Sequence, residues 1–373
     1  MSGPTPFSFR STARFADVGE AFEANFEAGE ELGARFVAYR HGEKIVDVFG
    51  GWSDKKKETP WTDETLACVY STGKAALALL VARAVAAGGL DYEGPVSDVW
   101  PGFAANGKDA ITLGQAMSHQ GGLCGFREEM PPETWLDWDG ICGRIAAMAP
   151  LWPPGSANGY HPQTYGFIVG EVLRRATGRT VGETLYEDEF MARGIDVHCG
   201  LKPEAADWTA YMPKPPRAPD LGPLTEYKEL AFLKPWSAPA RVAREDWMAA
   251  EIPASNMHAT ADGLARLLQP LASREAEDAL PPEAVEAALR VRIEGSDLVL
   301  PFDLAWAAGL MRNRNGHFGP SETAFGHAGF GGSCVVIDPA QGLTAAYVMN
   351  KMSPYLVGDP RAVRLIEALY AGL

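Results

Sequence analysis

The chain lacks long apolar runs, paired cysteines and clustered histidines. No stretch approaches the roughly 18 continuous apolar residues of a membrane span, and the segment MSGPTPFSFRSTARFADVGEAF contains no apolar core of a secretory signal. The five cysteines form no C-x-x-C pair, and the seven histidines form no H-E-x-x-H or H-x-H pattern. We therefore expect free buried thiols, no metal, no other cofactor and no membrane contact, and we place the protein in the cytoplasm.

Positive charge is also scarce. Lys and Arg total 33 against 48 Asp and Glu, which gives a formal net charge of -15. Because such a charge repels phosphate backbones, we expect no nucleic-acid partner. The segment GFAANGK, residues 102–108, matches G-x-x-x-x-G-K, but Asp109 stands where a nucleotide site needs Ser or Thr, and no strand precedes it. A nucleotide site is therefore discounted.

Strand patterns occur near both ends of the chain, and helical patterns occur between them. With 46% hydrophobic residues, the 373-residue chain is long enough for one large domain or two interlocked ones. The patterns predict a helix over 16–32, two strands in ARFVAYRHGEKIVDVFGGW around a His41-Gly42 turn, mostly helix from Ser71 to about 290, strands at 302–311, 332–338 and 342–350, and a closing amphipathic helix at 359–373.

These patterns indicate an α+β fold. Short hairpin-like connections favour an antiparallel β-sheet flanked by the N- and C-terminal helices, with a helical insertion domain. We assign residues 1–70 and 290–373 to a discontinuous sheet domain and residues 71–289 to a mainly helical domain.

The segment CVYSTGKAALALL places Ser71 and Lys74 three residues apart before a helix that is apolar on nearly every face. A helix of this kind is normally buried, and burial lowers the pKa of a lysine amine below its reference value near 10.4. Lys74 can then accept the proton of Ser71 as the serine attacks an acyl group. The alternative is a capping serine followed by a lysine that reaches solvent, and Ser53 with Lys56 repeats the spacing in a charged turn.

Tyr160 follows a proline-glycine loop and precedes a helix predicted from about Thr164 to a C-cap at Gly178. Its phenol can relay a proton to a leaving group, or share the base role with Lys74 if nearby cations lower its pKa from about 10. Taken alone, a loop tyrosine is more often a packing residue whose hydroxyl meets water.

The segment FGHAGFGGSCVVID, residues 325–338, places His327 and several glycines at the start of an apolar strand. Glycines such as Gly329 allow a ligand to approach the backbone closely, and they can equally mark a bulge or bend. Backbone N–H groups on such an edge can form an oxyanion hole.

In this order, the three segments resemble the S-x-x-K, Y-x-N and K-T-G signature of the serine β-lactamase and penicillin-binding-protein superfamily. The resemblance is closest to the class C-like branch, especially the family VIII carboxylesterases, and extends to ITLGQAMSHQGGL and NMHATADGLARLL. It implies a site between the sheet and helical domains. It also implies that Ser71 is the nucleophile, Lys74 the base and Tyr160 the partner in proton transfer, with the N–H groups of Ser71 and Phe330 as the oxyanion hole.

Two positions depart from this signature. Pro162 replaces the asparagine of Y-x-N, and His327 replaces the lysine of K-T-G, so that neither a side-chain amide nor a fixed positive charge is available. Recognition of an anionic acyl donor is therefore expected to be weak. We assign substrate contacts to His327, Gly329 and Trp152, and to His161 beside Tyr160, whereas His119 is expected to be structural.

The predicted function is that of a serine carboxylesterase acting on short-chain neutral esters, with a small-molecule ester as its binding partner. One alternative is a β-lactamase or a D-amino-acid amidase or peptidase. Another is a catalytically inactive homologue that binds a ligand, although retention of Ser71, Lys74 and Tyr160 argues against it.

Overall fold

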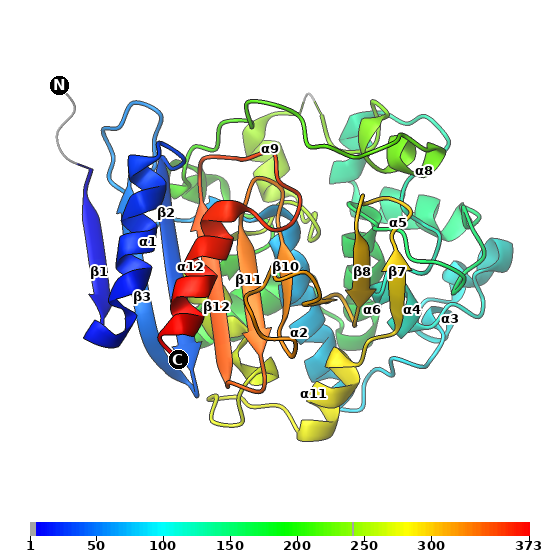
Figure 1. Cartoon of the computed structure of the whole chain (residues 1–373). Helices are drawn as coiled ribbons and strands as arrows, with labels where there is room; N and C mark the ends of the chain where they lie inside the picture. The colour runs from blue at the N-terminus through cyan, green and yellow to red at the C-terminus, as the bar shows by residue number, and fades with distance from the viewer. Residues whose placement is uncertain (1–4, 241) are drawn as a thin grey trace.

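The computed structural model describes residues 5–240 and 242–373. Its main feature is a nine-stranded antiparallel sheet in the order β1-β3-β2-β12-β11-β10-β9-β8-β7 (Figure 1). The strands are β1 (Phe7–Ser11), β2 (Gly33–Arg40), β3 (Glu43–Gly51), β7 (Ile293–Ser296), β8 (Asp303–Trp306), β9 (Met311–Arg312), β10 (Phe325–Ala328), β11 (Cys334–Asp338) and β12 (Leu343–Met349). The two ends of the chain therefore build one sheet.

The two groups of strands join where β2 pairs with β12, in a register that places Arg40 opposite Leu343 and Ala34 opposite Met349. The β2–β3 hairpin turns at His41 and Gly42, whose φ angles of 51° and 80° are both left-handed. A turn of this type matches the twist of antiparallel strands. The predicted pair of strands around this turn is confirmed.

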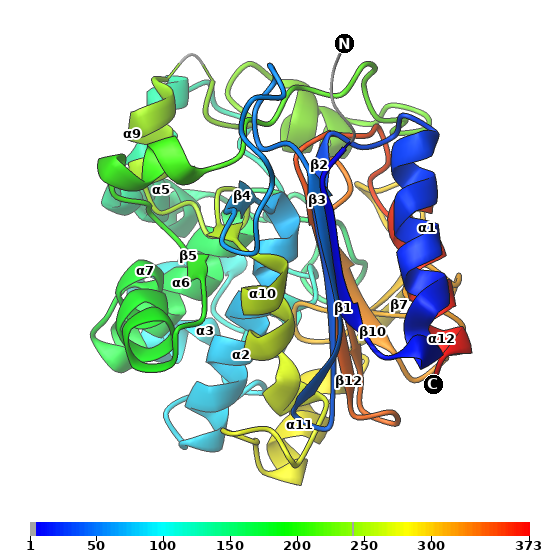
Figure 2. The same cartoon turned by 90° about the vertical axis from the view of Figure 1, so that its left-hand side faces the viewer.

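Helices cover both faces of the large sheet, as Figure 2 shows edge-on. The terminal helices α1 (Ala16–Glu27) and α12 (Pro360–Ala371) lie on one face, and α2 (Gly73–Ala86) and α10 (Ala261–Leu267) lie on the other. The helix predicted over 16–32 ends at Glu27, and the predicted closing helix is confirmed. The expected α+β fold, an antiparallel sheet with terminal helices and a helical middle, is likewise confirmed.

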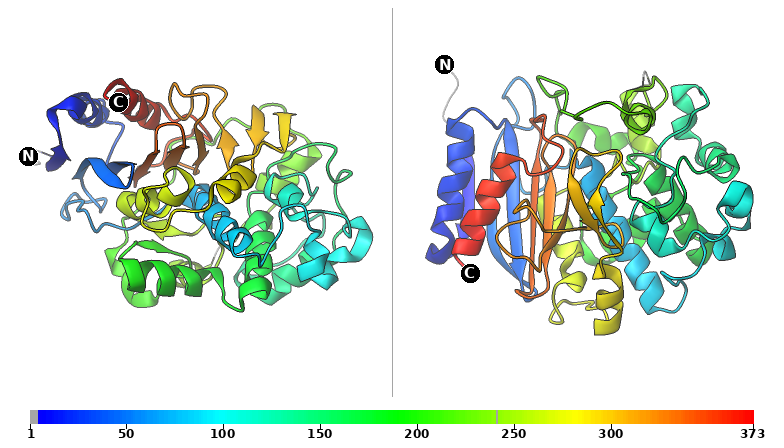
Figure 3. Two further views of the ribbon diagram at one scale, coloured as in Figure 1. Left: turned by 90° about the horizontal axis from the view of Figure 1, so that it is seen from below. Right: turned by 45° about the vertical axis from the view of Figure 1, so that its right-hand side comes forward.

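The middle of the chain is mainly helical and lies beside the sheet (Figure 3). Its further α-helices are α3 (Val96–Val99), α4 (Leu113–Met117), α5 (Trp138–Ala147), α6 (Thr164–Thr177), α7 (Val181–Thr184), α8 (Glu226–Lys228), α9 (Arg244–Ala249) and α11 (Pro282–Leu289). Short 3₁₀ helices are η1 (Ala13–Phe15), η2 (Tyr70–Thr72), η3 (Pro101–Gly107), η4 (Pro132–Leu136), η6 (Pro203–Trp208) and η8 (Gln269–Leu271), and π-helical turns are η5 (Leu185–Met191) and η7 (Glu229–Leu233). In the described part of the chain, no helix is both long and apolar enough to span a membrane.

Several strands escaped the sequence patterns. The segment 302–311, predicted as one strand, is two short strands, β8 and β9, because the chain turns between them at Gly309 with a φ of +79°. A second sheet, in the order β4-β6-β5, joins β4 (Ala67–Cys68), β5 (Val197–His198) and β6 (His258–Ala259). Strands of two residues are too short to show an alternating pattern, so only long-range pairing reveals them.

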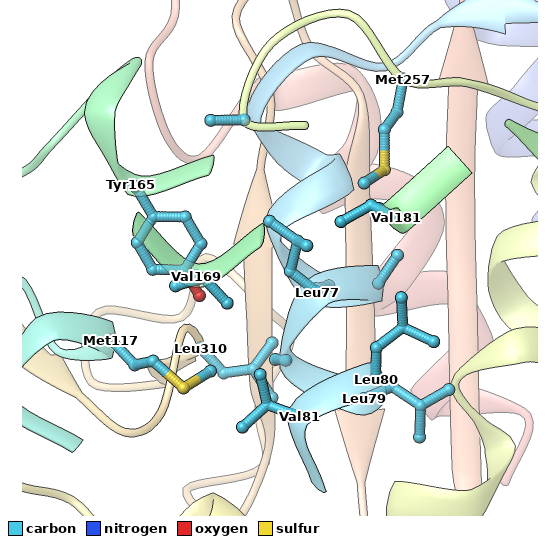
Figure 4. Packing of buried hydrophobic residues seen from close by; sticks show 14 of the residues in the cluster. Leu77, Leu79, Leu80, Val81, Met117, Tyr165, Val169, Val181, Met257 and Leu310 are labelled. Atoms are coloured by element: carbon cyan, nitrogen blue, oxygen red, sulfur yellow. The ribbon is translucent and has the colours of Figure 1, made fainter. Parts of the chain in front are cut away.

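Helix α2 runs through the interior between the sheet and the helices. Every residue from Gly73 to Ala82 is buried, as its apolar sequence predicted. Figure 4 shows Leu77 and Val81 packed among Tyr165 and Val169 of α6 and Leu310, which lies between β8 and β9. The first turn of α2 is therefore surrounded by protein.

Candidate active site

Ser71 lies in η2, the 3₁₀ turn that leads into α2. The residue before it, Tyr70, has a left-handed φ of 45°, a conformation that is sparsely populated by residues other than glycine. Strand β4 directly precedes this turn, and between them the Val69 N–H donates to the Met257 carbonyl at 2.9 Å. The nucleophile predicted from S-x-x-K thus occupies a tight turn that is fixed from both sides.

Lys74 lies one helical turn after Ser71 and is fully buried. Its Nζ is 3.1 Å from Ser71 Oγ and 3.0 Å from the carbonyl oxygens of Pro162 and Ala254. Burial lowers the pKa of Lys74 well below its usual value. A neutral amine has two N–H donors for the two carbonyls and a lone pair for the Ser71 hydroxyl, so this geometry suits a base.

Ser53 and Lys56, which share the S-x-x-K spacing, provide the contrast. Ser53 is partly exposed and its hydroxyl donates to the Thr59 carbonyl at 3.2 Å, while Lys56 is exposed. Lys74, in contrast, is fully buried beside its serine. Burial of the lysine, not the spacing, distinguishes the two motifs.

Tyr160 lies in the loop that precedes α6, and its side chain is buried against Lys74. Lys74 Nζ is 4.8 Å from the centroid of the Tyr160 ring, and the phenol lies close enough to Ser71 for that side chain to influence its pKa. Burial raises the pKa of Tyr160, an effect that the neighbouring Ser71 opposes only in part. The condition set for Tyr160 to share the base role, a pKa lowered by nearby cations, is not met, because desolvation dominates. Lys74 therefore loses its proton before Tyr160 does.

Asp297 holds the Tyr160 loop and was missed by the sequence analysis. Its Oδ1 accepts hydrogen bonds at 2.9 Å from the backbone N–H groups of Tyr160, Val299 and Leu300, and its Oδ2 accepts one at 2.8 Å from Asn158. An aspartate that binds N–H groups two and three residues ahead is typical of a turn, which is the only local signal. Its bond to Tyr160 spans 137 residues and is visible only in the fold.

The segment FGHAGFGGSCVVID forms β10, the loop that follows it and β11, and this loop lies beside the turn that carries Ser71. A side chain at Gly329 would collide with the Val69 carbonyl and with Ser333, and the rings of Phe330 and Tyr70 pack edge-on with centroids 5.8 Å apart. Among residues 5–240 and 242–373, neither the Ser71 nor the Phe330 backbone N–H donates to another group of the protein. Two such free donors beside a nucleophile suit an oxyanion hole.

His327 lies in β10 and is buried beside Tyr160, with ring centroids 6.1 Å apart. Its Nδ1 donates to the Ala328 carbonyl at 2.8 Å, so that Nε2 carries a lone pair. Burial, assisted by Lys74, lowers the pKa of His327 to about 3. This position therefore carries no positive charge near neutral pH, and its role as a substrate contact stays a prediction.

His161 directly follows Tyr160 in the chain, and Trp152 packs against the His161 ring. His161 Nε2 accepts the Leu123 N–H at 2.8 Å, and burial lowers the pKa of His161 to about 3. The indole of Trp152 is buried, packs edge-on to His161 and donates its N–H to the Ala157 carbonyl at 3.1 Å. Both side chains therefore have protein partners, and their assignment as substrate contacts stays a prediction.

His119 lies beside both Tyr160 and His161. Its Nδ1 accepts the His161 backbone N–H at 3.2 Å, and its ring packs against Tyr160 and Trp306 with centroid distances of 4.8 and 4.4 Å. These contacts fit the structural role expected for His119. In the described part of the chain, no three His, Cys, Asp or Glu side chains gather as metal ligands would.

A family model described as Beta-lactamase matches residues 20–368. Among known proteins, "Esterase/beta-lactamase LipL" of Mycobacterium tuberculosis (strain ATCC 25618 / H37Rv) is 31% identical over 369 residues, which cover 93% of this chain and 83% of that protein. The match extends over nearly the whole chain, so it includes both the sheet and the helical middle.

Two solved structures are similar in fold and sequence. A penicillin-binding protein homologue from Caulobacter crescentus has a TM-score of 0.96 and 48% identity. The match covers 99% of this chain and 100% of the homologue's chain. A structure described as a family VIII carboxylesterase has a TM-score of 0.91 and 34% identity, with the same coverage. Both therefore extend over nearly the whole of this chain.

Proposed function

The chain belongs to the Beta-lactamase family and is a serine hydrolase with that fold, and on this premise we propose that it is a carboxylesterase that hydrolyses short-chain neutral esters. The observation that carries the proposal is the Lys74 amine, which is buried, depressed in pKa and 3.1 Å from Ser71 Oγ. No charged side chain is needed in this arrangement to activate the serine.

In the acylation step, Ser71 Oγ attacks the ester carbonyl carbon as its proton passes to Lys74 Nζ. A new C–O bond forms, and the carbonyl electron pair moves onto the oxygen. This oxygen accepts hydrogen bonds from the backbone N–H groups of Ser71 and Phe330. Collapse of this intermediate breaks the bond to the alcohol. The departing oxygen takes the proton from Lys74 through the neutral hydroxyl of Tyr160, and the acyl group remains on Ser71.

Deacylation reverses these roles with water. Lys74, neutral again, removes a proton from a water molecule that attacks the acyl carbon, and the Ser71 oxygen leaves with the proton returned by Lys74. Tyr160 suits the relay because its raised pKa keeps the phenol protonated throughout. The lysine changes charge in each half-reaction, whereas the tyrosine passes a proton along.

The choice of a neutral ester rests on the absence of a cation among the proposed substrate contacts. His327 is neutral at pH 7 because burial lowers its pKa to about 3, and Lys74 must be neutral to act as a base. A carboxylate on the substrate would be desolvated beside these groups without a partner, which is unfavourable. β-Lactams carry such a carboxylate, so they are expected to be poor substrates.

We expect p-nitrophenyl butyrate to be hydrolysed with a kcat/KM at least about tenfold higher than p-nitrophenyl hemisuccinate, which corresponds to roughly 1.4 kcal/mol of discrimination. The two esters share a leaving group and differ in one carboxylate. Steady-state assays at neutral pH, with nitrocefin and D-alanine p-nitroanilide as further substrates, measure the preference. Faster hydrolysis of nitrocefin or of the anilide than of the butyrate would instead support the β-lactamase or amidase alternative.

Asp297→Asn should lower kcat for p-nitrophenyl butyrate about tenfold or more, because one carboxylate oxygen that accepts N–H groups becomes an NH₂ donor. Either the Tyr160, Val299 and Leu300 N–H groups or Asn158 then lose their acceptor, and small displacements at a catalytic group are costly. Asp303→Asn, at an exposed position in the adjacent β8, is the matched control. Equal kcat values for the two folded variants would show that Asp297 does not position Tyr160.

A further inference from the structure

The loop after β10, residues 329–333, is attached to the nucleophile turn on its active-site side. Ser333 Oγ donates to the Val69 carbonyl at 2.8 Å and lies 3.0 Å from Thr72 Oγ1. Within the loop, the Gly329 N–H donates to the Ser333 carbonyl at 2.7 Å. These bonds join the residues on both sides of Ser71 to the loop that carries the Phe330 N–H.

The same loop is held from the opposite side by Arg361, in the first turn of α12. Arg361 is buried, and its Nη2 donates to the Gly331 carbonyl at 2.9 Å. The Ser353 N–H donates to the same carbonyl at 2.9 Å. Helix α12 covers the face of the sheet opposite α2 (Figure 2). Arg361 therefore contacts the loop from the side that faces away from Ser71 and Lys74.

The guanidinium of Arg361 is itself fixed by two buried carboxylates. Nε and Nη2 donate to the two oxygens of Asp359 at 3.0 and 2.8 Å, and Nη1 donates to Glu31 at 3.1 Å and to the Lys351 carbonyl at 2.8 Å. The remaining Nη2 donor is the one that binds Gly331. All five donors of a guanidinium are thus used in its fixed fork geometry.

The loop packs closely against this group. Gly331 and Gly332 have φ angles of +98° and +126°, and a Cβ on Gly332 would collide with the Arg361 guanidinium and the Asp359 carboxylate. A cavity of about 10 Å³ beside Gly329, Gly332 and Asp359 has space for no more than about one water. Movement of the ion cluster would therefore move the loop.

We propose that Arg361 is a positioning residue of the oxyanion hole: its bond to the Gly331 carbonyl fixes the turn that presents the Phe330 N–H to the substrate oxygen. The inference rests on the proposed function and adds to it a residue that touches no reacting atom.

The test compares Arg361→Lys and Arg361→Gln with Arg35→Gln. Arg35 forms an equally buried ion pair with Asp47, at 2.9 Å, between β2 and β3, and takes no part in the proposed site. Each variant is assayed with p-nitrophenyl butyrate and with the thionoester in which sulfur replaces the carbonyl oxygen. Because sulfur is a weak hydrogen-bond acceptor, the ratio of the two kcat values reports on the oxyanion hole and does not depend on the fraction of folded enzyme.

We expect Arg361→Gln to lower kcat for the oxoester about tenfold or more, with KM nearly unchanged, and to lower the oxoester-to-thionoester ratio by about the same factor. Arg361→Lys should restore little, since an ammonium cannot donate to Gly331, Asp359 and Glu31 in one plane. Arg35→Gln should leave the ratio at the wild-type value even where it lowers stability.

Folded Arg361 variants with a wild-type ratio would overturn the inference while leaving the proposed function intact. If neither Arg361 variant folds, Asp359→Asn decides the question, because it weakens the hold on Arg361 and retains a side-chain acceptor for the start of α12; an unchanged ratio there overturns the inference too. Failure of the proposed function is recognised separately, as a wild-type enzyme that does not hydrolyse the oxoester.

Discussion

Ser71→Ala is expected to lower kcat for p-nitrophenyl butyrate by at least about 10⁴-fold, since removal of the nucleophile in serine hydrolases costs on the order of 10⁶. The residue lies in η2, directly before α2, with its Oγ 3.1 Å from the Lys74 amine. Alanine removes the only atom that forms the acyl-enzyme and leaves the buried helix unchanged. Stopped-flow or steady-state release of p-nitrophenol measures the loss.

Ser53→Ala is the matched control, because Ser53 begins the second S-x-x-K of the chain in a partly exposed turn. It should keep wild-type turnover. A serine-reactive phosphonate should add one label to the wild-type protein and to Ser53→Ala, located at Ser71 by mass spectrometry, and none to Ser71→Ala. Wild-type turnover in Ser71→Ala, or a label on another residue, would refute the proposed nucleophile.

Lys74→Met is expected to lower kcat by about 10³-fold, within the range for loss of a general base. Methionine retains the length and burial of the side chain but has no lone pair on nitrogen to accept the Ser71 proton. Lys74→Arg should lose about as much, because a guanidinium stays protonated in proteins. The same p-nitrophenol assay, with circular dichroism to confirm folding, measures both losses.

The pH dependence has a definite direction. The base works only when Lys74 is neutral, so kcat/KM should rise with pH through the Lys74 pKa, which burial holds well below its usual value, and then level off. Tyr160 adds no step near neutral pH because its pKa is raised. His161 and His327, with pKa values of about 3, stay neutral between about pH 5 and 8.

The control for Lys74 is Lys56→Met, in the exposed turn with the same spacing from a serine. It should leave both kcat and the pH profile unchanged. In Lys74→Met, the rise of kcat/KM with pH should disappear from whatever activity remains. A Lys74→Met enzyme with the wild-type profile would mean that another group accepts the proton.

Much of the site was predictable because its parts are local in the chain. Ser71 and Lys74 are one helical turn apart, and the unbroken apolar sequence after them predicted the burial that the structure shows from Gly73 to Ala82. Gly178 was predicted as the C-cap of the helix after Tyr160 and adopts the expected left-handed φ of 76°. Each of these predictions depends on a pattern within a short stretch of the sequence.

Two features of the structure could not be obtained from the sequence patterns. A base role for Tyr160 depended on a pKa lowered by nearby cations, but the fold surrounds the phenol with His119, Trp306 and His327, whose desolvating effect raises the pKa. The single strand predicted over 302–311 became two, because the chain turns at Gly309. A periodic pattern reports which residues face the interior but not where the chain reverses.

The sequence by itself determined the α+β class, the order of the three motifs and the pairing of Ser71 with Lys74, because hydrophobic periodicity and helical spacing are local properties. Only the tertiary structure decided what surrounds the lysine that we propose as the base. The carbonyls of Pro162 and Ala254, 88 and 180 residues away, bind its amine, and the packed helices exclude water from it. Asp297 and Arg361 likewise act across the fold. A pKa and the position of a loop depend on what surrounds a group, and those surroundings are assembled from segments that only folding brings together.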